Sequence, residues 1–272
     1  MTRRIFSLLD VADDYDAIVF DQWGVLHNGS TPYPKAQPTI HALNAKGTRM
    51  AVLSNSGKRE APNSARIGQM GFDPSHFEYV MTSGEALWRD MAAGLIPQTH
   101  FYAIERAAGD ATDWSVGLDL VFCDTLAKAD AILLMGLPDG MTLADWEPTL
   151  AQAATRNLPL FCSNPDLHSP RAGGFVVSPG TLAQAYAHMG QSVAYYGKPH
   201  RPVFKSLQSA LGTDRLLMVG DSLGHDIKGA AGAGWDSLLI ESGLLADETG
   251  DLTELLAKEG CPPPTYQIET LQ

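Results

Sequence analysis

Short runs of apolar and β-branched residues recur along the chain. Several of these runs are continuous instead of alternating, which is typical of strands covered on both faces in a parallel sheet. The predicted strands lie at 17–20, 49–54, 131–136, 158–164, 192–197, 216–221 and 236–241. Segments with apolar residues at helical spacing lie between them. The predicted helices lie at 39–47, 83–95, 142–157, 180–190 and 200–212.

This alternation of strands and helices predicts an α/β fold with a doubly wound parallel sheet. Right-handed crossovers place the connecting helices on both faces of such a sheet. No repeat or low-complexity tract interrupts the pattern. In a sheet of this type, ligands bind outside the carboxyl ends of the strands. The polar residues that follow the predicted strands are therefore the first candidates for a functional site.

Polar residues of complementary kinds follow four of the predicted strands. They include carboxylates, a hydroxyl, an amide and an ammonium group, and strand ends at one edge of a sheet bring such groups together. We expect one crevice to gather Asp21, Ser54, Asn55, Lys198, Asp221 and Asp226.

The chemistry of these groups favours phosphoryl transfer. Three aspartates in one crevice repel one another unless a cation lies among them, and their hard oxygen ligands suit Mg²⁺, with Mn²⁺ as the alternative. Lys198 and the hydroxyl of Ser54 can hold the non-bridging oxygens of a transferring phosphoryl group. An aspartate at a strand tip can attack phosphorus and form an aspartyl-phosphate.

Composition narrows the classes of partner. The 272 residues carry a net charge of -12, and no basic run offers a footprint for nucleic acid. The first sixteen residues, MTRRIFSLLDVADDYD, contain neither a signal peptide nor a membrane span, so we expect a cytoplasmic protein without membrane contact. Cys123, Cys162 and Cys261 show no CxxC spacing, which argues against a zinc site or a disulfide framework.

Four segments, DQWGV, SNSG, GKPH and GDSLGHD, occur in this order and resemble the four motifs of the haloacid dehalogenase (HAD) superfamily. The likeness covers nearly the whole chain, and four ordered motifs are far more specific than any one alone. The resemblance implies that Asp21 is the nucleophile and a metal ligand, that Ser54 binds phosphate and that Lys198 stabilises charge. Asp221 and Asp226 would hold or orient Mg²⁺.

The long insert between the second and third motifs resembles that of the subfamily with a large α/β cap, which includes nucleotide, glycolate-phosphate and pyridoxal-phosphate phosphatases. The resemblance implies a HAD-like core at 1–82 and 179–272 and an inserted cap domain at 83–178. Asn55, Asp166 and His168 would contact the substrate. Because a cap that folds over the site excludes bulky substrates, we expect a small phosphorylated metabolite. A homodimer is compatible with the sequence, which does not define the oligomeric state.

Trp23 departs from the resemblance. Phosphatases of the superfamily normally carry a second aspartate two residues after the nucleophile, which protonates the leaving oxygen and later activates water. The indole can do neither, since its N–H is only a hydrogen-bond donor. The backbone carbonyl of Trp23 can still fill the metal-ligand role of this position.

Three explanations for Trp23 stay open. His27 or His168 replaces the missing acid, the leaving group needs no acid, as in an acyl phosphate, or the chain is a weak enzyme. General acid–base catalysis contributes about 10²–10⁴-fold to rates, so its loss predicts slow turnover. Our hypothesis is a Mg²⁺-dependent phosphatase, slow or biased towards good leaving groups. The rival is a nearly inactive protein that binds Mg²⁺ and a phosphorylated ligand as a sensor or assembly partner.

Overall fold

The protein folds as two compact units. The computed structural model describes residues 2–171, 174–243 and 251–271. The first unit comprises 1–54, 60–81 and 198–272, and the second comprises 55–59 and 82–197. The chain therefore leaves the first unit twice, once for a segment of five residues.

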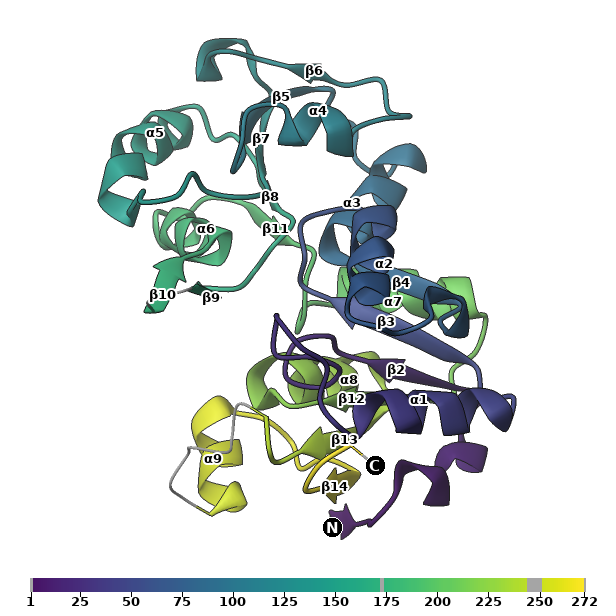
Figure 1. Ribbon diagram of the computed structural model, residues 1–272. Helices are drawn as coiled ribbons and strands as arrows, with labels where there is room; N and C mark the ends of the chain where they lie inside the picture. Colours follow the sequence, from purple (N-terminus) through teal and green to yellow (C-terminus); the bar gives the residue numbers. More distant parts are fainter. Residues whose placement is uncertain (1, 172–173, 244–250, 272) are drawn as a thin grey trace. The chain divides into compact units, whose positions relative to one another are not determined.

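The first unit is built around a seven-stranded sheet, counted over the described residues. Every strand pair with a defined register is parallel, as the continuous apolar runs predict. Across the sheet the order is β1 (Arg3–Arg4), β14 (Tyr266–Ile268), β13 (Asp236–Ile240), β12 (Leu216–Gly220), β2 (Ala17–Phe20), β3 (Met50–Ser54) and β4 (Tyr79–Thr82). Figure 1 labels these strands except β1.

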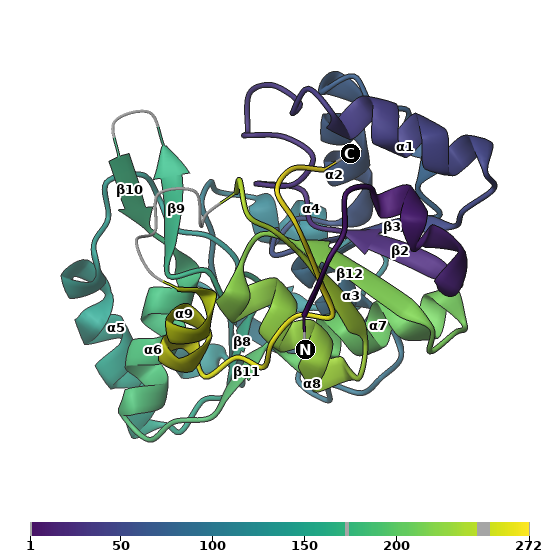
Figure 2. The same cartoon turned by 90° about the horizontal axis from the view of Figure 1, so that it is seen from below.

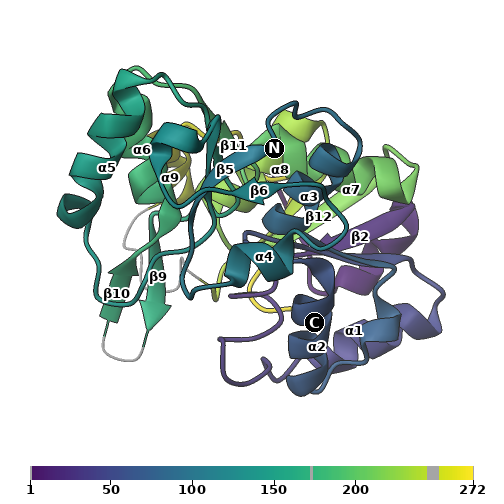
Figure 3. The same ribbon diagram turned by 90° about the horizontal axis from the view of Figure 1, so that it is seen from above.

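Helices cover both faces of this sheet, so the doubly wound α/β prediction is confirmed. Figures 2 and 3 both show β2 lying between α1 (Ala36–Ala45) and α7 (Arg201–Leu211). One core cluster joins Ile18 and Phe20 of β2 to Ile40 of α1 and to Ile67 of α2 (Glu60–Gln69). The remaining helices of the first unit are α8 (Lys228–Ala233) and α9 (Leu252–Glu259).

The second unit has a parallel sheet of its own, with five strands among the described residues. The order is β11 (Val193–Tyr195), β8 (Leu160–Cys162), β7 (Ala131–Leu134), β5 (His100–Ile104) and β6 (Val121–Phe122). A separate antiparallel pair consists of β9 (His168–Arg171) and β10 (Gly174–Val177). Sequence order thus reverses between β7 and β5.

Helices also cover both faces of the second sheet. Figures 1 and 3 show α5 (Leu143–Thr155) and α6 (Pro179–His188) on one side, and α3 (Ser83–Ala92) and α4 (Asp110–Trp114) on the other. The α5 and α6 helices bury a core against β7 and β8. None of the helices in the described part of the chain has both the length and the apolar character that a membrane span requires.

The second unit extends further along the chain than the predicted cap range of 83–178. The second unit ends at Gly197, because it includes α6 and β11. Leu182 and Tyr186 of α6 lie in its core, and β11 pairs with β8 in the register Ala194↔Phe161. A boundary at residue 179 would separate these elements from the sheet they cover.

Candidate active site

Asp21 and Asp221 follow two neighbouring strands of the first unit. The β2 and β12 strands are buried along their whole lengths and run parallel, with Phe20 opposite Val219. The backbone N–H of Asp21 continues this ladder by donating to the carbonyl oxygen of Val219 at 2.9 Å. Both carboxylates therefore lie at the carboxyl edge of the sheet, where the sequence pattern predicts a ligand site.

Asp226 completes a cluster of three carboxylates. It lies on a π-helical turn, Leu223–Ile227, that follows β12. One carboxylate oxygen each of Asp21, Asp221 and Asp226 lies within 4.8 Å of the others. Asp226 is fully buried, and its Oδ2 accepts a hydrogen bond from the backbone N–H of Ser222 at 3.1 Å. The turn thus holds this carboxylate in a fixed orientation towards the strand ends.

Lys198 supplies the positive charge of the cluster. Its Nζ donates to Asp21 Oδ1 at 2.6 Å and to Asp226 Oδ1 at 2.7 Å, and only 3% of its side chain is exposed. Burial alone would lower the pKa of Lys198, but the two carboxylates outweigh this effect and raise the pKa above its usual value. Burial raises the pKa of Asp21 to about 7, with Lys198 acting in the opposite direction.

The surroundings of the carboxylates leave no room for extra side-chain atoms. Gly24 has φ +90°, and a Cβ at this position would lie 1.9 Å from Asp221 Oδ2. A Cβ at Gly220 would lie 2.2 Å from the Cβ of Asp226. Glycine is therefore required at Gly24 for its backbone conformation as well as for this close approach.

The donor set fits a divalent cation. When ionised, three carboxylates carry two more negative charges than the single ammonium of Lys198 offsets. All three offer hard oxygen ligands, which Mg²⁺ prefers over nitrogen or sulfur. A cation among them would offset the repulsion by Asp226, which adds to the effect of burial on the pKa of Asp21. Asp21, Asp221 and Asp226 are thus the residues that could hold a metal ion; the predicted contribution of the Trp23 carbonyl stays a prediction.

Trp23 lies on the tight turn after Asp21. The backbone carbonyl of Gln22 accepts from the N–H groups of both Leu26 and His27 and closes this turn. The Trp23 side chain is 38% exposed. A Cβ at Gly29 would lie 2.8 Å from the indole Nε1, so the ring edge packs against that glycine. The indole is therefore a packing element of the turn and offers no group for proton transfer.

His27, one of two suggested replacements for the missing acid, is buried within the same turn. Its Nδ1 accepts from the backbone N–H of Gly29 at 3.0 Å. Burial, with a smaller effect of Arg66, lowers the pKa of His27 to about 4. Near pH 7 the ring is thus neutral, and the hydrogen bond to Nδ1 assigns its proton to Nε2. A neutral imidazole is a poor proton donor, so this geometry argues against His27 as the leaving-group acid.

The other predicted site residues are divided between the two units. Ser54 ends β3 in the first unit, next to β2. Asn55 and Asp166 both belong to the second unit, where Asn55 Nδ2 donates to Asp166 Oδ1 at 2.7 Å. The exposed His168 begins β9 in that unit. The structure thus joins Asn55 to Asp166, while Asp21, Lys198, Asp221 and Asp226 form the cluster of the first unit.

Tyr33 lies near this cluster and was not a predicted site residue. Burial raises its pKa, and the carboxylate of Asp221 adds to the effect. Its backbone N–H donates to the carbonyl oxygen of Leu26 at 3.0 Å. This bond places Tyr33 where the loop that follows Asp21 folds back on itself. No periodicity or motif in the sequence marks this tyrosine, because only the path of the loop brings it there.

Two family models match the chain. Residues 18–107 match the model described as haloacid dehalogenase-like hydrolase, and residues 195–271 match a second HAD-hydrolase-like model. The matched ranges contain Asp21 and Ser54 in the first model and Lys198, Asp221 and Asp226 in the second. They are thus the regions that carry the four sequence motifs.

Curated relatives span nearly the same length. An acid sugar phosphatase of Staphylococcus aureus is 26% identical over 94% of this chain and 95% of its own length. A dihydroxyacetone phosphatase of Corynebacterium glutamicum is 25% identical over 84% of this chain and 81% of its own.

Solved structures share the fold. A haloacid dehalogenase-like hydrolase from Brucella suis has a TM-score of 0.82 and 28% identity, and the match covers 98% of this chain and all of the other. A glycerol phosphate phosphatase from Mycobacterium tuberculosis, solved with magnesium, has a TM-score of 0.75 and 22% identity over 94% of this chain and 76% of its own. A divalent metal in that fold agrees with the donor set of this chain.

Proposed function

Because the chain belongs to the haloacid dehalogenase-like hydrolases, we propose that it is a phosphatase that hydrolyses small phosphorylated metabolites through Asp21. The observation that carries this proposal is the cluster of Asp21, Asp221 and Asp226, in which Asp21 and Asp226 accept hydrogen bonds from the buried ammonium of Lys198. The sugar and dihydroxyacetone phosphatases among its relatives support a small phosphorylated substrate.

Asp21 is the nucleophile in this proposal. One of its carboxylate oxygens attacks phosphorus, the bond from phosphorus to the leaving oxygen breaks, and the leaving oxygen takes the bonding pair. Water then attacks the phosphorus of the aspartyl-phosphate, the bond from phosphorus to the Asp21 oxygen breaks and restores the carboxylate, and the proton of the water passes to solvent as phosphate leaves. Lys198 orients Asp21 through its hydrogen bond and stabilises negative charge on the transferring group.

Mg²⁺, held by Asp21, Asp221, Asp226 and the Trp23 carbonyl, would supply positive charge that draws the phosphate towards the nucleophile. The hydroxyl of Ser54, together with Asn55, is assigned to the non-bridging phosphate oxygens. Asp166 and His168 are assigned to the rest of the substrate. The hydrogen bond between Asn55 and Asp166 supports a common task for these two side chains.

The leaving group decides how fast Asp21 is phosphorylated in this proposal, whereas hydrolysis of the aspartyl-phosphate is the same step for every substrate. Trp23 cannot protonate a leaving oxygen, and the neutral ring of His27 is poorly suited to do so. An alkoxide must then leave without help, whereas an acyl or aryl phosphate releases a stable anion. The expected preference is for acyl and aryl phosphates, with alkyl phosphates slower by about 10²-fold or more.

The second candidate is a binding protein that retains the metal and phosphate sites without significant turnover. Trp23 is the observation that favours it, because the indole occupies the position of the expected acid. The retention of all three carboxylates and of Lys198 speaks against complete loss of the site. Because Asp21 is a metal ligand in both candidates, turnover is what separates them.

A Mg²⁺-dependent assay over alkyl, aryl and acyl phosphates tests the proposal. The wild-type protein is expected to hydrolyse p-nitrophenyl phosphate and acetyl phosphate, and Asp21→Asn to lower the rate by at least about 10³-fold, as for loss of a covalent nucleophile. An unchanged rate in Asp21→Asn would reject the nucleophile. No turnover of any substrate, with Mg²⁺ still bound, would favour the binding protein.

A further inference from the structure

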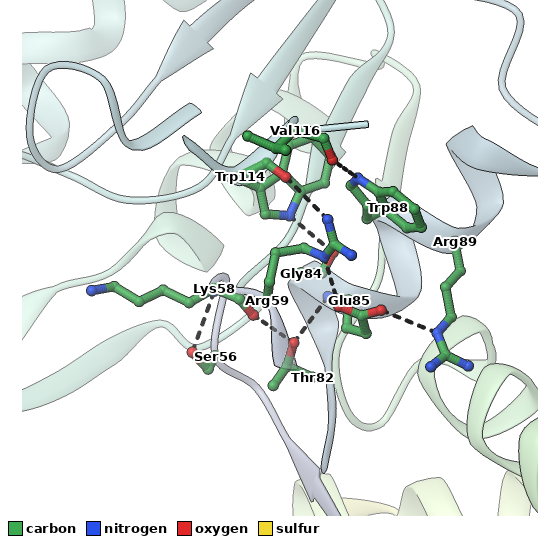
Figure 4. A network of polar contacts seen from close by, with 10 residues as sticks. All are labelled: Ser56, Lys58, Arg59, Thr82, Gly84, Glu85, Trp88, Arg89, Trp114 and Val116. Atoms are coloured by element: carbon green, nitrogen blue, oxygen red, sulfur yellow. Dashed lines mark hydrogen bonds and ion pairs between the residues drawn. The ribbon is translucent and has the colours of Figure 1, made fainter. Parts of the chain in front are cut away.

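The segment 55–59 directly follows Ser54 but is bound by the second unit. Three of its residues are held there through polar contacts. Asn55 contacts Asp166 as described above, the N–H of Gly84 donates to the carbonyl oxygen of Ser56 at 3.1 Å, and the hydroxyl of Thr82 donates to the carbonyl oxygen of Lys58 at 2.5 Å. Figure 4 shows this segment beside the start of α3.

Close packing fixes the middle of the segment. A Cβ at Gly84 would lie 2.0 Å from the carbonyl oxygen of Gly57, so any side chain at Gly84 would displace the segment. A Cβ at Gly57 would lie 2.9 Å from both the carbonyl oxygen of Met135 and the hydroxyl oxygen of Ser163. The backbone at Gly57 is therefore enclosed by helix α3 on one side and by the ends of β7 and β8 on the other.

Arg59 anchors the end of the segment. Its guanidinium stacks on the Trp88 ring, with Cζ 3.7 Å from the ring centroid, and its Nε donates to Glu85 Oε2 at 2.6 Å. Nη1 donates to the backbone carbonyl of Trp114 at 3.4 Å. Only 6% of the Glu85 side chain is exposed, and Arg89 donates to its other oxygen at 3.2 Å. Figure 4 shows Glu85 between the two arginines.

We infer that Arg59 and Glu85 are positioning residues for the phosphate-binding loop, which comprises Ser54 and the backbone N–H groups of residues 55–57. This inference rests on the proposed function. Successive backbone N–H groups after a strand form a concave site for an anion, and its affinity depends on their orientation. The contacts of Arg59 hold the far end of this loop, and β3 holds the near end.

The ion pair between Arg59 and Glu85 suits this task because both groups are constrained. Glu85 lies in the first turn of α3, and the preceding residue Thr82 caps the helix by accepting from the Glu85 N–H at 2.9 Å. Stacking on Trp88 restricts the guanidinium plane, which an ammonium group could not match. Loss of Arg59 removes the contacts that tie the loop to the helix, while Arg89 still neutralises Glu85.

Titration calorimetry with inorganic phosphate in the presence of Mg²⁺ tests the inference in the full-length protein. Arg59→Ala and Gly84→Ala are expected to weaken phosphate binding about 10-fold, the effect of losing one backbone N–H hydrogen bond to phosphate when the loop is displaced. Arg59→Lys is expected to fall between wild type and Arg59→Ala. For p-nitrophenyl phosphate, kcat/KM is expected to fall in parallel with phosphate affinity.

Two variants serve as matched controls. Arg89→Ala removes the other arginine of Glu85 but leaves the loop contacts, and Gly232→Ala adds a methyl group at an exposed helical position where no atom lies within 4 Å. Both are expected to bind phosphate within about twofold of wild type. Thermal unfolding of every variant shows whether the measured protein is folded.

Three outcomes overturn the inference. They are wild-type phosphate affinity in folded Arg59→Ala and Gly84→Ala, an equal loss in Arg89→Ala, and no phosphate binding by the wild-type protein. Failure of the proposed function has another signature, since it appears as no turnover by the wild type. Phosphate affinity still reports on the loop in that case.

Discussion

Polar residues follow the strands of both parallel sheets, but their charges are paired differently in the two units. In the first unit, Asp21, Asp221 and Asp226 lie close together, and the ammonium group of Lys198 binds two of them, Asp21 and Asp226. The cluster is buried and its negative charge is in excess when the carboxylates are ionised. A bound cation or a charged reacting group can therefore change the electrostatic energy of the cluster strongly.

In the second unit, the groups at the corresponding edge pair with their neighbours. Glu105 follows β5, and its carboxylate accepts from the backbone N–H groups of Gly109 at 3.0 Å and Ala111 at 2.7 Å. Arg106 pairs with Asp139, and both of these side chains are well exposed. Here each charge has a nearby local partner or open access to water.

The comparison separates architecture from chemistry. Strand order reverses at β5 and β7 in the second unit, which is where ligands commonly bind in open α/β sheets. The carboxylate of Glu105 satisfies the backbone donors of that crevice, so the favourable topology alone does not make an anion site. Function follows from the kinds of charged groups that gather at strand ends, and the fold only provides their location.

The largest expected effect comes from removing the ammonium group of Lys198. It lies at the carboxyl edge of the first unit's sheet, which we call the first edge. Lys198→Met leaves Asp21 and Asp226 buried without their common partner, which is expected to lower the free energy of unfolding by about 3–5 kcal/mol. Added Mg²⁺ is expected to restore part of this loss, because it binds the same carboxylates in the folded state. Chemical denaturation with and without Mg²⁺ measures both effects.

The matched change in the second unit is Arg106→Met. Its partner Asp139 has 74% of its side chain exposed, so water solvates the remaining charge. The expected change is within about 0.5 kcal/mol, and Mg²⁺ should not alter it. Equal losses in the two variants would contradict the distinction between the edges.

A smaller effect tests whether the first edge lacks only an acid. Trp23→Asp places a carboxyl group two residues after Asp21, and the hydrolysis of alkyl phosphates is expected to rise by about 10²-fold. Aryl phosphates, whose leaving groups need little protonation, should change much less. Trp23→Ala is the control, because it removes the indole without adding an acid. A similar gain in Trp23→Ala would show that the indole merely blocks the site.

The sequence predicts the first edge well because its signal is local. A continuous buried run followed by an aspartate, as at Asp21 and Asp221, specifies both a central strand and the edge where the carboxylate lies. The predicted doubly wound fold follows from the same runs. The α2 helix, in contrast, escapes prediction, because its sequence EAPNSARIGQ buries only Asn63 and Ile67 and has no extended apolar stripe.

Contacts between distant positions could not be predicted. Asn55 and Asp166 are 111 positions apart, and no periodicity links them. Arg59 lies just before α2 in sequence, so a contact within the first unit would be the simplest expectation. Its bond to Glu85 arises because the chain makes a brief excursion into the second unit. Such pairing depends on the path of the whole chain.

A pH-dependent effect tests whether charge at the first edge is confined to the cluster, with none on the adjoining loop. His27 has a pKa of about 4 in the folded protein, against an ordinary value of about 6.5. As the pH falls from 6.5 towards 4, His27 takes up a proton in the unfolded chain but stays neutral in the folded protein. Its contribution to stability is therefore present above pH 6.5 and is lost by up to about 1.4 kcal/mol per pH unit in this window.

His27→Gln removes this dependence, whereas His168→Gln, at the exposed start of β9, leaves it in place. Denaturant unfolding at several pH values measures the difference between the variants, and parallel curves for wild type and His27→Gln would show that this ring carries charge in the folded state.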